Sequence, residues 1–260
     1  MGRLENKIAI VTGAGQGIGR GISRAFAKEG ATVVVASRTL SSAEKVVREI
    51  QDIGGRAKAI QCDVGFEDQV RGMVAETVAA FGAVDILVNN AQSFGTAQAP
   101  TNYPIPSPLE VSGNEEWEFT LRTGFWSTLW AMQAVFPYMK EKGGKIINFG
   151  SMSGQRGERG LGPYNVTKEA IRTLTRTAAR EWGRYGINVN VINPGAKTRA
   201  LEESQRDHPP KTPPEKAIPL GRLGDPEKDI GAVALFLASS DGDYITGMTM
   251  MADGGLLMGP

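Results

Sequence analysis

The sequence predicts a single α/β domain over residues 1–260, built on a doubly wound parallel sheet of about seven strands with helices on both faces. Short apolar runs rich in β-branched residues alternate with longer segments of helical periodicity, and this alternation favours parallel strands joined by helices. A glycine-rich turn separates the first such run from the first helical segment. A chain of 260 residues is long enough for one such domain.

The expected strands share short runs of apolar, often β-branched residues. They occupy residues 7–11, 32–37, 57–61, 84–88, 145–149, 187–192 and 248–252. The expected helices have apolar residues at helical spacing, and they occupy residues 18–29, 41–52, 67–81, 115–140, 164–184 and 225–239. Right-handed crossovers between such strands give a doubly wound sheet, in which ligands bind beyond the carboxyl ends of the strands.

Composition excludes several classes of function. A formal net charge of +1, with basic and acidic residues intermixed, gives no electrostatic reason to expect nucleic acid or an anionic membrane as a partner. Cys62 is the one cysteine, so neither an intrachain disulfide nor a cysteine-built metal site is expected. The chain lacks a signal-peptide core and a membrane-spanning apolar run. We therefore expect a cytoplasmic protein.

The glycine-rich turn, residues 12–19, reads TGAGQGIG and has the spacing G-x-x-x-G-x-G. Glycines between a strand and a helix allow the backbone to approach a pyrophosphate, and the helix N-terminus offers free N–H donors. This spacing differs from the G-x-G-x-x-G of the standard dinucleotide motif. Its position between two strand-like runs nevertheless indicates a nucleotide site.

Tyr164 and Lys168 are four residues apart in a helical segment, and Ser151 precedes them by thirteen residues. A spacing of four places two side chains on one face of a helix. An ammonium near a phenol would lower the phenol pKa from about 10, which favours proton transfer to or from an alcohol or ketone oxygen. A serine hydroxyl from a neighbouring strand end would hold the same oxygen.

Together these segments resemble the short-chain dehydrogenase/reductase family. Further matches are the segment NNA at 89–91, the Pro-Gly turn at 194–195 and the C-terminal segment 245–255. The resemblance implies a Rossmann-type fold, with Ser151, Tyr164 and Lys168 as the catalytic residues. It also implies a dinucleotide site made by Gly13, Gln16, Gly17, Ile18, Gly19, Ser37, Arg38, Asp63, Val64, Asn89, Ala91, Tyr164, Lys168, Pro194, Gly195, Ala196 and Thr198.

The end of the second strand bears on the choice of dinucleotide. Members that bind NAD usually have an acidic residue there, whereas this chain has Ser37 followed by Arg38. An arginine binds a 2′-phosphate through a charge-assisted fork, so we expect NADP(H), with NAD as the less favoured alternative. Arg38 as a plain solvated loop residue is the alternative interpretation. Asp63 matches the family's adenine contact, or else it caps the following helix.

Two positions depart from the family pattern. Gln92 stands where the family usually has glycine after the NNA segment, and Gly124 aligns with an asparagine that many members use in a proton relay. Thr123 or water would then substitute in the relay, proton exchange would be slower, or the alignment is displaced by the long preceding loop. We still expect catalysis, because Ser151, Tyr164 and Lys168 are present.

Two loops, residues 92–114 and 199–219, are rich in proline and are expected to line or cover a substrate pocket, or to be surface connections. His208, in the second loop, is the one histidine, and we expect it to be a surface residue. No metal site is expected. The aromatic residues of the segment 115–140 are expected to be core, and the resemblance implies that this helix and the Tyr164 helix make a homotetramer or homodimer.

The predicted function is NADP(H)-dependent interconversion of a secondary alcohol and a ketone by hydride transfer, with Tyr164 as general acid or base and a small-molecule substrate. Two alternatives remain at this point: a keto-acyl or enoyl reductase of lipid metabolism, and a catalytically silent dinucleotide-binding sensor. Substrate identity, direction and stereochemistry depend on the two loops.

Overall fold

A computed structural model describes residues 2–210 and 213–258. Its central sheet has the strand order β3-β2-β1-β4-β7-β8-β9, and every pairing is parallel. The strands are β1 (Ile8–Thr12), β2 (Thr32–Ser37), β3 (Arg56–Gln61), β4 (Ile86–Asn89), β7 (Gly144–Phe149), β8 (Ile187–Pro194) and β9 (Thr249–Ala252). The order reverses direction at β1 and β4, so the expected doubly wound sheet is confirmed.

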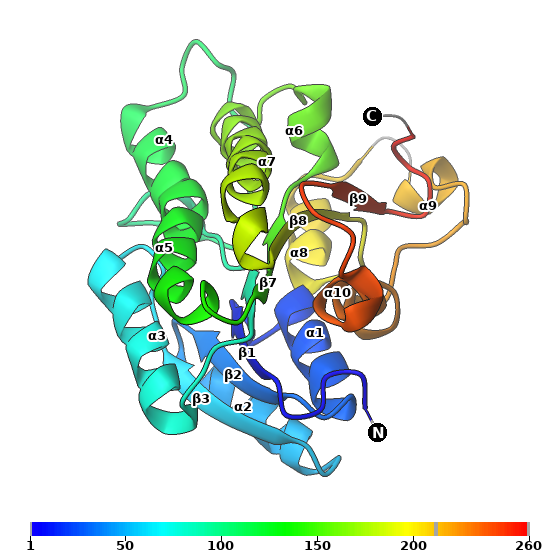
Figure 1. Ribbon diagram of the computed structural model, residues 1–260. Helices are drawn as coiled ribbons and strands as arrows, with labels where there is room; N and C mark the ends of the chain where they lie inside the picture. The colour runs from blue at the N-terminus through cyan, green and yellow to red at the C-terminus, as the bar shows by residue number, and fades with distance from the viewer. Residues whose placement is uncertain (1, 211–212, 259–260) are drawn as a thin grey trace.

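Helices cover both faces of the sheet (Figure 1). One face packs against α1 (Gly17–Lys28), α2 (Leu40–Gln51) and α10 (Gly231–Ala238), through a core that includes Phe26 and Ile50. The other face packs against α3 (Glu67–Phe81), α5 (Ser127–Met139) and α7 (Gly162–Trp182). Alternate residues of each strand enter the two cores, because successive side chains of a strand point to opposite faces: Val33 and Val35 lie in the first core and Val34 in the second.

Two expected helices are interrupted. The segment expected as one helix over 115–140 is α4 (Asn114–Leu121), a π-helical turn η1 (Arg122–Trp126) and α5. The Thr128 hydroxyl donates a 2.8 Å hydrogen bond to the Gly124 carbonyl, and such bonds to the preceding turn bend helices. The segment 225–239 likewise begins with a π-helical turn, η3 (Pro226–Ile230), before α10. Hydrophobic periodicity does not distinguish a π-helical turn from a regular one.

The aromatic residues of the segment 115–140 are only partly core, contrary to expectation. Met132 is fully buried, whereas Trp126 is 46% exposed. Tyr138 on α5 and Val166 on α7 are also exposed. The outer surface of these helices is thus more apolar than a solvated face requires.

Several short elements lie in segments for which the sequence predicts no regular structure. In the loop 92–114, β5 (Phe94–Gly95) and β6 (Pro100–Thr101) form a small antiparallel pair. The other added elements are α6 (Met152–Arg156), α8 (Arg199–Asp207), α9 (Pro214–Ala217) and η4 (Ser240–Gly242). The expected helix 164–184 is α7 followed by the short 3-10 turn η2 (Gly183–Tyr185). Residues 1, 211–212 and 259–260, which belong to the expected domain and the second loop, lie outside the described residues. Within the described ranges, no helix combines the length and the apolarity that crossing a membrane requires.

Candidate active site

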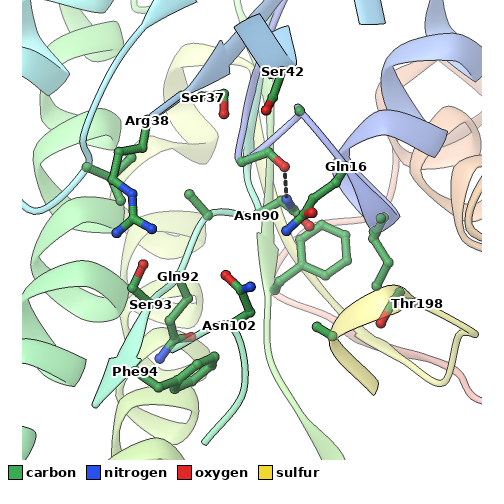
Figure 2. Close-up of a pocket in the computed structure, with 18 of the residues that line it drawn as sticks. Gln16, Ser37, Arg38, Ser42, Asn90, Gln92, Ser93, Phe94, Asn102 and Thr198 are labelled. Atoms are coloured by element: carbon green, nitrogen blue, oxygen red, sulfur yellow. Dashed lines mark hydrogen bonds between the residues drawn. The ribbon is translucent and has the colours of Figure 1, made fainter. Parts of the chain in front are cut away.

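A cavity of about 520 Å³ lies at the carboxyl ends of the strands, where the sequence places the site. Figure 2 shows residues from the glycine turn, the end of β2, the segment after β4 and Thr198 facing one another across it. The expected site residues that line it are Gly13, Gln16, Gly17, Ile18, Ser37, Arg38, Asp63, Val64, Ala91, Tyr164, Lys168, Pro194 and Thr198. Five others, namely Gly19, Asn89, Ser151, Gly195 and Ala196, are not among its lining residues.

The glycine turn has a shape that only glycine permits at several positions. Gly13 and Gly17 have φ angles of +63° and +54°, a region that disfavours other residues. A Cβ at Gly19 would lie 2.6 Å from the Gly13 carbonyl oxygen, and a Cβ at Gly15 would lie 2.9 Å from Oγ of Ser37. Gln16, the N-cap residue of α1, makes no side-chain capping hydrogen bond, so the N-terminal amides of α1 are left for an anionic ligand.

Thr12 and Asn90 join the glycine turn to the segment after β4. The Thr12 hydroxyl accepts hydrogen bonds from the backbone amides of Asn90 and Ala91, each at 3.1 Å. The Asn90 side-chain amide donates to the carbonyls of Thr12 at 2.9 Å and Gly13 at 3.3 Å (Figure 2). Sequence reasoning missed both roles, although each residue lies within a quoted motif. The network fixes the turn against β4 and explains why a polar residue ends β1.

Asn89 lies beneath the cavity. Its amide donates a 2.9 Å hydrogen bond to Oδ1 of Asn148, whose own amide donates to the Thr175 hydroxyl at 2.9 Å. These three side chains are buried, and each meets the demand of a buried polar group for a partner. Asn89 therefore links β4, β7 and α7, and neither Asn148 nor Thr175 has a sequence signal that marks it.

Ser151, Tyr164 and Lys168 meet where β7 and α7 approach each other. Ser151 is the N-cap of α6, and its hydroxyl accepts a 3.1 Å hydrogen bond from the Ser153 amide. Lys168 Nζ donates a 3.0 Å hydrogen bond to the Phe149 carbonyl and lies 5.6 Å from the ring centroid of Tyr164. The predicted trio is thus brought together on one side of the cavity.

The pKa values of this trio differ from the sequence-based expectation. Burial raises the pKa of the Tyr164 phenol, although the Ser151 side chain acts in the opposite direction. The sequence predicted a lowered tyrosine pKa, which is wrong for the protein without bound ligands, because loss of hydration outweighs the hydrogen bond with Ser151. Burial also lowers the pKa of Lys168 to about 7.

This lowered lysine pKa predicts a pH-dependent stability. Between pH 7 and about 10, the unfolded chain protonates Lys168 and the folded protein does not. Lys168 should therefore make the free energy of unfolding rise with pH across that window, since stability rises wherever the unfolded state binds more protons, whereas the raised pKa of the buried Cys62 thiol acts in the opposite direction above about pH 9. Urea unfolding at pH 7 and pH 9.5 checks this. The rise should be smaller in Lys168→Met, and equal slopes in both proteins would contradict the assignment.

Arg38 and Asp63 lie at the end of the cavity near β2 and β3. Arg38 is exposed and lines the cavity together with Ser37 and Ser42. Ser37 and Ser42 lie next to Gly15 of the glycine turn, and Figure 2 shows the Arg38 side chain extending toward Ser93. Oδ1 of Asp63 accepts a 2.9 Å hydrogen bond from the Gly65 amide, while Phe66 is the N-cap of α3. Asp63 thus stabilises its own turn and does not cap the helix.

The two variable loops, residues 92–114 and 199–219, contact each other beside the cavity. The Tyr103 hydroxyl, just after β6, donates a hydrogen bond to the carboxylate of Asp207 at the end of α8. The hydrogen bond from Arg199 lowers the pKa of Glu203 on α8, and a weaker interaction with Asn102, which lines the cavity, acts in the same direction. His208 is exposed, and its ring lies 6.3 Å from that of Tyr103. Phe94 lies edge-on to Tyr164 at 5.3 Å, so an aromatic wall faces the phenol.

Comparison of the sequence with known proteins identifies the family to which this chain belongs. The family model described as enoyl-(acyl carrier protein) reductase matches residues 13–257. The chain belongs to the short-chain dehydrogenase/reductase family. It is therefore an oxidoreductase that acts on CH–OH or C=O groups.

Several relatives within the short-chain dehydrogenase/reductase family match almost the whole chain. A 12α-hydroxysteroid dehydrogenase from a Clostridium species is 36% identical, with 98% of each chain covered. A galactitol 2-dehydrogenase from Agrobacterium fabrum is 37% identical over 97% of this chain and 98% of its own. A 3-oxoacyl-(acyl-carrier-protein) reductase from Staphylococcus epidermidis is 38% identical over 97% of this chain and 100% of its own.

The fold matches a solved member of the same family. A structure of 7α-hydroxysteroid dehydrogenase complexed with NADH and 7-oxo glycochenodeoxycholic acid superposes with a TM-score of 0.87 at 35% identity. The match covers 97% of this chain and 95% of the other.

Among residues 2–210 and 213–258, no three His, Cys, Asp or Glu side chains are grouped as a metal ion would need.

Proposed function

We propose that this protein interconverts a secondary alcohol and a ketone with NADP(H), using Tyr164 as general acid or base. The observation that carries the proposal is that Tyr164 and Lys168 line a cavity that begins at the glycine turn, while the Ser151 side chain interacts with the Tyr164 hydroxyl. The residues present fit a dinucleotide: a Cβ would fill the cradle at Gly13 and Gly19, and the α1 N-terminus has amides for a pyrophosphate.

Within this proposal each residue of the trio has a defined task. In carbonyl reduction the Tyr164 hydroxyl donates its proton to the carbonyl oxygen, and in alcohol oxidation the phenolate accepts the hydroxyl proton. The Ser151 hydroxyl donates a hydrogen bond to the same oxygen and stabilises its developing charge. Lys168 holds the dinucleotide's ribose, and its protonated form favours the phenolate. The chemistry that the dinucleotide supplies when bound is hydride transfer.

The remaining expected cofactor residues complete this proposed site. Asp63 and Val64 would receive the adenine, Asn89 and Ala91 would pack beside the nicotinamide ribose, and Gln16, Ile18 and Gly17 would follow the pyrophosphate. A second group would orient the carboxamide: Pro194, Gly195, Ala196 and Thr198. The preference for NADP(H) rests on Arg38 and on the lack of an acidic side chain at the end of β2.

We also propose a homodimer or homotetramer, formed through the apolar outer surface of α5 and α7. Three exposed apolar side chains support this assembly: Trp126 at the end of η1, Tyr138 on α5 and Val166 on α7. Exposed apolar patches mark interaction sites. Sedimentation of the purified protein measures it directly.

The relatives direct the choice of test substrates. Hydroxysteroid, sugar-alcohol and 3-oxoacyl activities appear in the names of similar proteins, so a keto-acyl reductase is the second candidate. The experiment measures NADPH and NADH binding, then NADPH oxidation with 7- and 12-ketosteroids, ketohexoses and 3-oxoacyl thioesters. We expect NADPH to bind more tightly and to be oxidised with a ketone. Tight binding without turnover on every substrate would instead favour a dinucleotide-binding sensor.

A further inference from the structure

The side chain of Gln92 ends in a buried amide at the wall of the active-site cavity. Neither its nitrogen nor its oxygen has a hydrogen-bond partner among the described residues. Gln92 lines the same cavity as Tyr164 and Lys168, and Figure 2 shows it beside Phe94. A buried polar group without a partner destabilises a folded protein, so each one in a native structure requires a specific reason.

The amide packs directly against Gly124 in the π-helical turn. A Cβ at position 124 would lie 2.9 Å from Nε2 of Gln92 and 2.4 Å from Cγ2 of Thr167. Thr167 immediately precedes Lys168 on α7, and its hydroxyl is fixed by a 2.7 Å hydrogen bond to the Pro163 carbonyl. The Gln92 amide and the Thr167 methyl group together occupy the space that a side chain at position 124 would need.

The two departures noted in the sequence are therefore one structural feature. Residue 92 has a side chain where a glycine was expected, residue 124 has none where an asparagine was expected, and the two positions touch. The π-helical conformation of residues 122–126 is also a form that occurs frequently at functional sites.

We propose that Gln92 supplies a functional amide to the active site, delivered from the loop after β4 into the space that Gly124 leaves open beside the Lys168 helix. An amide both donates and accepts hydrogen bonds, so its partner is a hydroxyl group of the bound dinucleotide or substrate, or a water that arrives with them. A group retained at a cost in stability is typical of functional positions. The inference rests on the proposed function, because it assigns a role in that reaction.

The first test replaces the amide and keeps its volume. Gln92→Met should lower kcat/KM about tenfold or more, the loss expected for one hydrogen bond. Its Tm should be equal to or above that of the unchanged protein, because the variant removes an unpartnered buried amide. If the partner hydroxyl belongs to the dinucleotide, the Kd of NADPH rises; otherwise the loss appears at saturating NADPH. Gln51→Met, at an exposed glutamine at the end of α2 that does not line the cavity, is the matched control.

The second test moves the amide to the helix. The triple variant Gln92→Gly, Thr167→Ser, Gly124→Asn removes the two groups that would clash with a side chain at 124, keeps the hydroxyl of residue 167 and restores an amide. It should recover most of the activity that the double variant Gln92→Gly, Thr167→Ser loses. The same triple with Gly124→Ala restores volume without an amide and should not recover it.

Three results would overturn the proposal: full activity in Gln92→Met, equal recovery by alanine and asparagine at position 124, or no recovery by either. These failures are distinguishable from failure of the proposed function, which requires that the unchanged protein turn over no substrate, or that Tyr164→Phe retain full turnover. If the unchanged protein is active and Gln92→Met is equally active, the role proposed for Gln92 is wrong and the proposed function still stands.

Discussion

Tyr164→Phe should reduce kcat about 1,000-fold while leaving the Kd of NADPH nearly unchanged. The substitution removes one oxygen, so the ring should keep its edge contact with Phe94, but no hydroxyl remains to exchange a proton with the substrate oxygen. General acid–base catalysis contributes about 100- to 10,000-fold in enzymes, and this loss lies in that range. Steady-state rates at saturating substrate, together with fluorescence titration of NADPH, separate the two quantities.

Tyr244→Phe is the matched control for the loss of a phenol hydroxyl. Tyr244 is fully exposed and does not line the cavity, so its variant should keep full turnover. Unchanged turnover in Tyr164→Phe would show that another group transfers the proton.

Arg38→Asp should reverse the dinucleotide preference and weaken NADPH binding about 100-fold. A hydrogen bond to a charged group contributes about 1.5–3 kcal/mol, and a tenfold change corresponds to about 1.4 kcal/mol. The introduced carboxylate adds repulsion of a 2′-phosphate and offers acceptors to the ribose hydroxyls of NADH. Calorimetric titration of both dinucleotides measures the effect directly.

Two further measurements define the role of Arg38. Raising the salt concentration should weaken NADPH binding more than NADH binding, since exposed charges are screened. Arg48→Asp alters an exposed arginine of α2 that does not line the cavity and should leave both affinities unchanged. Equal NADPH affinity in the unchanged protein and Arg38→Asp would identify Arg38 as a solvated loop residue.

The sequence predicted the sheet and most helices because their signals are local. Each expected strand has a counterpart within a few residues; for example, the expected strand 32–37 is β2 (Thr32–Ser37). The glycine turn was equally visible, because its steric demands act between residues close in the chain. Gly13 and Gly17 have the left-handed backbone conformation, which is consistent with glycine at these positions of the motif.

Features that depend on contacts between distant segments were not predictable in this way. The Asn89–Asn148–Thr175 network spans three elements, and no spacing rule relates these residues. The contact between Gln92 and Gly124 was visible only as two separate departures from a pattern. The predicted direction of the Tyr164 pKa shift was wrong for the same reason. Burial depends on the folded surroundings, whereas the sequence shows only the neighbouring lysine.

The link between the two variable loops has a consequence for protein engineering. Tyr103 and Asp207 are 104 positions apart, yet each is the other's hydrogen-bond partner, and Asn102 and Glu203 lie on the same two segments. A graft that exchanges residues 92–114 with those of a relative would leave the Asp207 carboxylate without its phenol. Segments 92–114 and 199–219 should therefore be exchanged together, so that the hydrogen bond between Tyr103 and Asp207 is kept.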